Sequence, residues 1–342
     1  MQRALMILVV LLTCGGGEVD APVAAPEPGG GFWGVALGAY PWEAEARGFP
    51  FPPNLREVRE LGATDVLVPV SYRQATVQSN EVTPGPHTIE HRDLRALVRQ
   101  AHRDGLRTIL VPILHVERGG PTAWRGVVRP ANPDAWWASY QAYVLRYAAL
   151  AAQENVGLFV IGSELTSMTG PTSSERWRTL AAAVREVYRG PLAYCSNHDG
   201  LQRRAPFEFV DYAAVSAYFP LADTPDPQDE TVRARAAAAV AEVRALGASV
   251  KRPVLLLEVG FPSADGALMT PWDQTGGAPI DLEEQALGYR AIGEAVLAEE
   301  AIEGTLFWHW FGPGGEHDRY FTPRGKPAEA ELEGFLRQIQ AR

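Results

Sequence analysis

Two glutamates directly follow apolar segments of the chain. Glu164 comes after residues 160–163 and Glu258 after residues 255–257, so the two are 94 residues apart. Two carboxyl groups held about 5–5.5 Å apart can cleave a glycosidic bond with retention, because one attacks the anomeric carbon while the other protonates the leaving oxygen. A lone glutamate at such a place could instead stabilise a helix dipole or an ion pair. The repeated pattern favours a catalytic pair.

Eight short segments rich in valine, isoleucine, leucine and aromatic residues alternate with amphipathic stretches. They are residues 32–37, 65–72, 108–115, 157–164, 191–197, 212–218, 253–258 and 304–308. Several are almost continuously apolar, which is typical of parallel strands covered on both faces. Between two of them, Leu94, Leu97, Val98 and Ala101 repeat at the spacing of one helix face.

This alternation predicts an α/β fold, a single (β/α)8 TIM barrel over residues 32–342 with no second domain. A doubly wound, dinucleotide-binding sheet is disfavoured because no G-x-G-x-x-G follows the first segment. One βα unit of such a barrel takes about 31 residues. The spacing of 94 residues therefore places Glu164 and Glu258 on the fourth and seventh strands, facing each other across the barrel mouth.

Active sites of these barrels are built at the carboxyl ends of the strands. The predicted strands are apolar until they end, and there they carry Tyr72, Arg73, His115, Glu164, Asn197, His198, Tyr218, Glu258, Trp308 and His309. A buried core would not place ionisable groups there repeatedly, because an unpaired buried charge is costly. Other tryptophans divide by position: Trp33, Trp136 and Trp137 are expected to pack in the core, whereas Trp42, Trp124, Trp272 and Trp310 could line outer parts of a binding site.

Composition excludes several classes of function. The 342 residues carry a formal net charge of −10. The chain therefore lacks the excess of lysine and arginine with which proteins neutralise the phosphates of nucleic acid. The two cysteines, Cys14 and Cys195, cannot form a disulfide framework, and no CxxC or HExxH motif is present. Zinc binding by His115, His198 and His309 is disfavoured because they lack local ligand spacing. We therefore expect no metal and no cofactor.

The N-terminus has the pattern of an export signal. One arginine precedes an apolar run over residues 4–12, which is too short to span a bilayer but suits a signal-peptide core. Cys14 closes the run, so residues 1–13 are predicted to be a lipoprotein signal peptide and Cys14 the lipidated residue. An ordinary cleaved signal is the alternative. Residues 14–31, rich in glycine, proline and alanine, are predicted to be a tether. Glycine rather than aspartate after Cys14 favours the outer membrane, and the lipid anchor would be the only membrane contact.

In the order and spacing of several motifs, the chain resembles clan A of the glycoside hydrolases, and most closely glycoside hydrolase family 113. Besides the two glutamate segments, the matching motifs are Trp124-Arg125-Gly126, Trp136-Trp137, residues 185–188 with Gly190, residues 211–221, Pro271-Trp272 and Phe307-Trp308. The resemblance implies a TIM-barrel enzyme, a retaining endo-β-1,4-mannanase that acts on a polysaccharide or oligosaccharide.

The resemblance also implies roles for individual residues. Glu164 would be the acid/base, Glu258 the nucleophile, and Tyr218 would hydrogen-bond the nucleophile and orient it. Trp308 would be the platform under the reacting sugar. Further sugar contacts would come from His115, Asn197, His198, Arg73, Trp124, Arg125 and Trp272. Ser163 stands where clan A enzymes commonly carry an asparagine that contacts the sugar 2-hydroxyl, which leaves the configuration of the sugar at C2 open.

Two alternatives to a mannanase remain. The same mechanism could act on another β-glycan, such as a β-glucan, a xylan or an envelope glycan. A catalytically silent carbohydrate-binding lipoprotein is also possible, but binding alone does not require a second carboxylate opposite the first.

Overall fold

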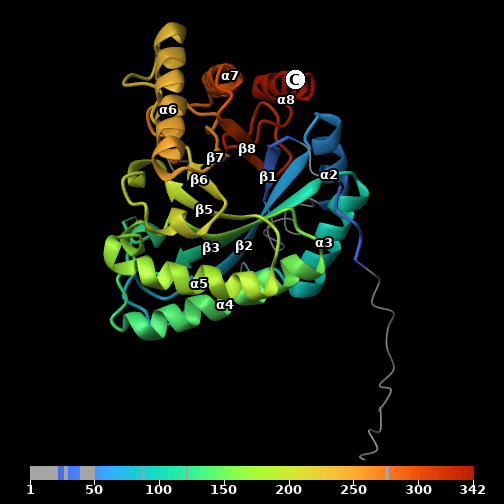
Figure 1. Cartoon of the computed structure of the whole chain (residues 1–342). Helices are drawn as coiled ribbons and strands as arrows, with labels where there is room; N and C mark the ends of the chain where they lie inside the picture. Colours follow the sequence, from blue (N-terminus) through green and yellow to red (C-terminus); the bar gives the residue numbers. More distant parts are fainter. Residues whose placement is uncertain (1–21, 27–29, 39–50, 87, 121, 274–276) are drawn as a thin grey trace, which may run out of the picture.

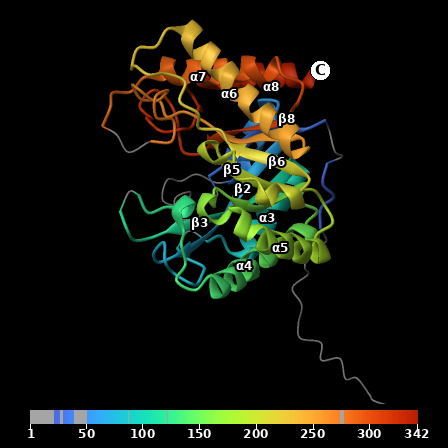
Figure 2. The same cartoon turned by 60° about the vertical axis from the view of Figure 1, so that its left-hand side comes forward.

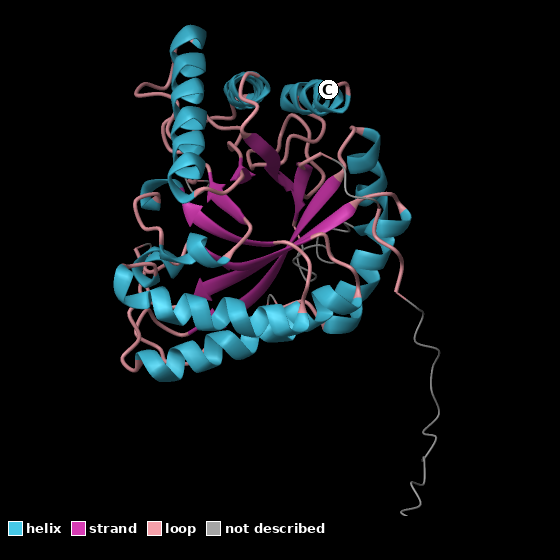
Figure 3. Cartoon of the chain, viewed as in Figure 1, coloured by secondary structure: helices cyan, strands magenta, loops and turns pink. Residues whose placement is uncertain are grey.

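The structure, a computed structural model, describes residues 22–26, 30–38, 51–86, 88–120, 122–273 and 277–342. Parallel strands close into a barrel in the order β1 to β8, and helices surround it (Figure 1, Figure 3). The strands are β1 (Phe32–Leu37), β2 (Asp65–Gln74), β3 (Arg107–Val116), β4 (Leu158–Ser163), β5 (Leu192–Asn197), β6 (Tyr212–Ser216), β7 (Val254–Val259) and β8 (Ile302–Trp310). The predicted (β/α)8 TIM barrel is confirmed.

Helices follow the strands and cover the outside of the barrel. They are α2 (Phe51–Glu60), α3 (His91–Arg103), α4 (Pro133–Gln153), α5 (Ser174–Val187), α6 (Asp229–Val250), α7 (Leu282–Leu297) and α8 (Pro327–Gln340). Two begin at side-chain caps: Asn132 accepts a hydrogen bond from the Ala135 N–H, and Asp281 accepts one from the Glu284 N–H. The caps satisfy backbone N–H groups that have no partner within the helix.

Two apolar layers hold the barrel together. Inside it, side chains such as Leu67, Ile109 and Leu257 fill the interior, and Cys195 is buried among them as a small apolar residue. Between barrel and helices, the predicted packing roles of Trp136 and Trp137 are confirmed, because both side chains are buried. Because side chains fill the interior, the binding site of such a barrel is expected at its rim.

Strand ends differ from the prediction at two places that concern the site. β4 ends at Ser163, because Glu164 adopts a left-handed backbone conformation with φ 54°. β6 ends at Ser216, so Tyr218 lies on the segment that follows. Ser216 is the register partner of Glu258 on β7, which brings the residues after β6 beside that glutamate.

The predicted signal peptide, with Cys14, and Trp42 lie outside the described residues. Of the predicted tether, only residues 22–26, 30 and 31 are described, and they belong to no helix or strand. Among the helices of the described part, none combines the length and apolar character needed to cross a membrane.

Candidate active site

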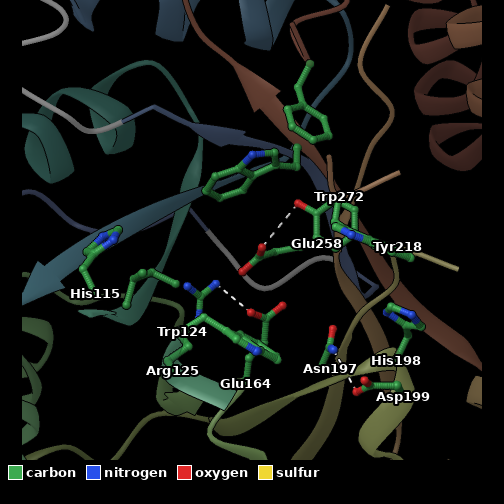
Figure 4. Close-up of a pocket in the computed structure, with 13 residues that line it drawn as sticks. His115, Trp124, Arg125, Glu164, Asn197, His198, Asp199, Tyr218, Glu258 and Trp272 are labelled. Atoms are coloured by element: carbon green, nitrogen blue, oxygen red, sulfur yellow. Dashed lines mark hydrogen bonds and ion pairs between the residues drawn. The ribbon is translucent and has the colours of Figure 1, made fainter. Parts of the chain in front are cut away.

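A cavity of about 590 Å³ opens at the carboxyl ends of the strands. Figure 2 shows the loops that follow β3 and β7 projecting from one side of the barrel, and residues of both loops line this cavity. Its lining is polar, charged and aromatic: Ile113, His115, Trp124, Arg125, Glu164, Asn197, His198, Asp199, Tyr218, Glu258, Trp272, Trp308 and Phe321 (Figure 4). Polar groups in a concave aromatic pocket are the usual setting of a ligand site.

Glu164 reaches the cavity through an unusual backbone conformation. Its φ of 54° is uncommon for a residue with a side chain, and such a conformation costs about 1–3 kcal/mol unless surrounding contacts enforce it. Here the Glu164 N–H donates to the Cys195 carbonyl at 2.8 Å, and the Leu165 N–H donates to the Tyr194 hydroxyl at 3.2 Å. Both partners belong to β5, so the neighbouring strand holds the turn that presents the carboxylate.

Arg125 forms an ion pair with Glu164, with 2.7 Å between Arg125 Nη2 and Glu164 Oε2 (Figure 4). Arg125 begins the short helix η1 (Arg125–Val127) after β3. The Trp124 ring lies across Gly126, where a Cβ atom would stand 2.3 Å from the ring, which explains the glycine of this motif. The Ser167 hydroxyl donates to the Val128 carbonyl at 2.6 Å and so ties this loop to the one after Glu164.

Glu258 is buried at the end of β7, with 3% of its surface exposed. The Tyr218 hydroxyl donates to Glu258 Oε2 at 3.5 Å, whereas Oε1 lacks a hydrogen-bond partner among the described residues. Burial raises the pKa of Glu258, and the negative charge of Glu164 raises it further, while Arg125 and Tyr218 act in the opposite direction. The electrostatic influence of Glu164 on Glu258 agrees with their common place in the cavity.

Tyr218 remains a hydrogen-bond donor over the working pH range. Burial raises the pKa of its hydroxyl well above the usual value, and the charges of Glu258 and Glu164 act in the same direction. A neutral hydroxyl is suited to donating to the carboxylate form of Glu258.

Aromatic and polar side chains form the walls. His198 stacks on Trp272 with ring centroids 5.6 Å apart and an interplanar angle of 22°, so residues after β5 and β7 meet at the cavity. Burial lowers the pKa of His198, which favours the neutral imidazole. Asn197 donates through Nδ2 to Asp199 Oδ1 at 2.8 Å. Trp308 is partly exposed at the end of β8, and the peptide bond between it and His309 is cis.

Two predicted site residues lie elsewhere. Ser163 is buried, with 1% exposed, and does not line the cavity. Arg73 lines an adjoining cavity of about 330 Å³, where it pairs with Glu117 at 2.5 Å. His115, the register partner of Arg73, borders both cavities.

The structure adds three residues that sequence reasoning did not identify as part of the site: Ile113 of β3, Asp199 and Phe321. Asp199 directly follows Asn197 and His198, so its position after a strand end could have identified it as a residue of the site. Phe321 comes from the loop after β8 and has no such signal. Trp310, in contrast, is buried and donates through Nε1 to Glu57 of α2 at 3.3 Å, away from the cavity.

The described part of the chain contains no group of three or more histidine, cysteine, aspartate or glutamate residues that could hold a metal ion. The cavity brings together two glutamates, one aspartate, one arginine, one tyrosine, two histidines and one asparagine between aromatic walls.

Comparisons with known structures support the fold. The chain is similar to the GH113 β-mannanase AaManA of Alicyclobacillus acidocaldarius, solved with ManMIm, with a TM-score of 0.79 and 24% identity over 91% of this chain and 98% of that one. A second GH113 β-1,4-mannanase gives a TM-score of 0.76 and 25% identity over 91% and 99%. A GH5_18 protein of Streptomyces cattleya, solved with Manβ1-4GlcNAc, gives 0.63 and 16% over 91% and 81%.

Sequence comparison identifies the family. No curated protein matches the chain. The model of Glycoside Hydrolase Family 113 matches residues 45–318, a span that contains both glutamates and every residue that lines the cavity except Phe321. The match covers most of the chain, and the protein therefore belongs to Glycoside Hydrolase Family 113 and is a glycoside hydrolase.

Proposed function

We propose that this glycoside hydrolase is a retaining endo-β-1,4-mannanase in which Glu258 is the nucleophile and Glu164 the acid/base. The observation that carries the proposal is the presence of both carboxyl groups in one cavity with aromatic walls. Membership of family 113 and the similarity to structures named as β-mannanases support mannan as the substrate. A second carboxylate opposite the first has no use in a protein that only binds sugar.

In the first step, a Glu258 oxygen attacks the anomeric carbon and forms a covalent glycosyl ester. The bond from that carbon to the leaving oxygen breaks, and the proton of Glu164 passes to the leaving oxygen. Glu258 Oε1 suits the attack because no described residue hydrogen-bonds to it, while Tyr218 donates to Oε2 and holds the carboxylate in place.

In the second step, water attacks the same carbon. Glu164 accepts a proton from the water, the bond between the sugar and Glu258 breaks, and Glu258 returns to its carboxylate form. Two inversions at one carbon give net retention of the β configuration.

Sugar binding would use the walls of the cavity. Trp308 offers an apolar surface for the C–H face of the reacting sugar, and Trp272 offers a second one near His198. His115, Asn197 and His198 carry donors and acceptors suited to hydroxyl groups. Trp124 and Arg125 lie beside Glu164, where a leaving sugar would stand.

Ser163 is not expected to contact the sugar directly. It is buried and does not line the cavity, so recognition of the C2 configuration would fall to Asn197 and the other residues of the cavity walls.

The adjoining cavity would receive a further sugar unit of the same chain. Arg73 and Glu117 line it, and His115 connects it to the two glutamates. We expect Arg73→Ala to lower kcat/KM for long manno-oligosaccharides by about tenfold, the effect of losing one charge-assisted hydrogen bond, and to leave the shortest cleaved substrate unaffected. Kinetics on an oligosaccharide series would measure this, and an equal loss on every length would contradict it.

The substrate and the stereochemistry are tested together. We expect release of reducing ends from the interior of β-1,4-mannan, and a first-formed product in the β configuration when the reaction is followed by NMR. Activity on β-glucan, xylan or an envelope glycan with none on mannan would reject the substrate. An initial α product would reject the retaining mechanism.

We further propose that the enzyme is exported and anchored to the cell envelope, at the outer membrane, by lipid on Cys14. The support is the apolar run that ends at this cysteine. Activity in the membrane fraction for the full chain, and in the soluble fraction for Cys14→Ala, is the expected result. Equal distribution of both forms would reject the anchor.

A further inference from the structure

The loop after β8 reaches the cavity without a strand or helix to support it. Residues 311–326, all of them described, lie between β8 and α8. Glu316 and His317 in the middle of this loop are exposed, whereas Phe321 is buried and lines the cavity. A loop segment that forms part of a binding site needs contacts that hold it in one position.

A buried lysine makes such contacts. Lys326 Nζ donates to Ser263 Oγ at 2.7 Å, to the Tyr320 carbonyl at 2.9 Å and to Asp318 Oδ1 at 3.0 Å. Its side chain has no exposed surface. The three acceptors match the three N–H donors of an ammonium group. Ser263 follows β7, whereas Asp318 and Tyr320 follow β8, so the lysine joins the loops after two neighbouring strands.

Ser263 and Asp318 complete this network. The Ser263 hydroxyl lies 2.7 Å from the Asp318 carbonyl and 3.2 Å from the Tyr320 carbonyl, so it can donate to one of them while it accepts from Lys326. The Tyr320 N–H donates to Asp318 Oδ1 at 2.8 Å. Burial lowers the pKa of Lys326, and the charge of Asp318 acts in the opposite direction and favours the ammonium form.

Phe321 connects the loop with the candidate nucleophile. Its carbonyl accepts a hydrogen bond from Gln285 Nε2 at 3.1 Å, and its ring meets the Tyr218 ring edge to face, with centroids 6.1 Å apart and an interplanar angle of 68°. The Tyr218 hydroxyl donates to Glu258 Oε2 at 3.5 Å (Figure 4). A continuous line of contacts therefore leads from the lysine to the glutamate.

The stability of α8 does not explain a lysine at this position. Lys326 is the N-cap residue of α8, where side chains that accept hydrogen bonds from the first N–H groups are preferred. An ammonium group accepts none, and its positive charge opposes the helix dipole. A buried ion pair is also weak evidence for a gain in stability. The contacts with the two loops explain the residue better.

The composition of the chain singles out the same residue. Of its 31 basic residues only two, Lys251 and Lys326, are lysines, and the others are arginines. Lys251 is exposed at the end of α6. An arginine carries five donors in a planar group, whereas the buried site around Lys326 offers three acceptors to a compact one.

Relying on the proposed role of Glu258, we propose that Lys326 is a positioning residue for the reaction. It ties the loops after β7 and β8 together, sets Phe321 against Tyr218 and so directs the Tyr218 hydroxyl at the nucleophile. Lys326 does not line the cavity itself.

The first test is kinetic and uses Lys326→Met, which removes the ammonium group and keeps most of the side-chain volume. We expect kcat on β-mannan to fall by about 10- to 100-fold, because a displacement of about 1 Å at a reacting group can cost 10²-fold. KM should stay within about twofold, since the substrate contacts remain. Lys251→Met is the matched control and should have wild-type kinetics. A wild-type kcat of Lys326→Met would overturn the proposal.

A double-mutant cycle separates positioning from general stability. Tyr218→Phe lacks the hydroxyl that Lys326 is proposed to direct, so Lys326→Met should lower kcat in that background by less than about twofold. Equal losses in both backgrounds would show a merely structural role and overturn the proposal. Should Lys326→Met fail to fold, Ser263→Ala takes its place, because it removes one acceptor of the lysine and should obey the same rule.

The second test needs no substrate, so its outcome is independent of the proposed function. In NMR spectra of the ligand-free protein, the ¹³Cζ signal of Tyr218 is assigned by its absence in Tyr218→Phe. It should shift in Lys326→Met and in Ser263→Ala but not in Lys251→Met. An unshifted signal in the first two variants would overturn the proposal. A shifted signal together with wild-type inactivity on every β-glycan would reject only the proposed function.

Discussion

Glu258→Ala is expected to abolish hydrolysis of β-mannan, with kcat lower on the order of 10⁵-fold, as when the nucleophile of a covalent mechanism is removed. The variant cannot form the glycosyl ester, and water at the vacated position is not activated. Sodium azide should restore turnover of a mannoside with a good leaving group, because the small anion fits the space of the lost carboxylate. The product should be an α-mannosyl azide, identified by NMR.

Glu303→Ala is the control for this experiment. Glu303 is exposed on β8 near the opposite end of that strand from Trp308, so its loss should leave kcat and KM unchanged. Hydrolysis by Glu258→Ala at the wild-type rate would show that Glu258 is not the nucleophile. A β-azide from this variant would indicate that the two glutamates have the reverse roles.

Glu164→Gln is expected to lower kcat/KM on mannan by between about 10²- and 10⁴-fold, the usual contribution of a general acid. Glutamine fills the same space but cannot protonate the leaving oxygen. The loss should shrink to a few-fold for an aryl mannoside whose leaving group needs no proton. Steady-state kinetics on both substrates would measure the difference.

A second readout separates the acid role from the base role. In Glu164→Gln the glycosyl ester should accumulate, since water lacks its base, and azide should release it as a β-mannosyl azide. Equal losses on mannan and on the activated mannoside, without azide rescue, would indicate that Glu164 only supports the structure of the cavity.

The apolar segments were sufficient to predict the barrel, because a parallel strand that is buried on both faces consists of consecutive apolar residues. All eight predicted segments overlap an observed strand. The ends were less predictable. β2 extends two residues further than expected, to Gln74, because it pairs with β3 along its whole length.

The position of a residue at a strand end was a good guide to the cavity but not a complete one. Glu164, Tyr218 and Glu258 lie together as expected. Arg73 also ends a strand, yet it borders the adjoining cavity and pairs with Glu117. Sequence position specifies the rim of the barrel, whereas side-chain packing decides which part of the rim each residue faces.

By itself, the sequence determined the barrel, its order of strands and the placing of two glutamates at the ends of the fourth and seventh of them. Only the tertiary structure decided that Arg125 pairs with Glu164, that Glu164 leaves its strand with a positive φ, and that Phe321 closes one wall. The reason is physical. Strand formation depends on the periodicity of neighbouring residues, whereas the charge and direction of a catalytic side chain depend on loops that meet only after the barrel has closed.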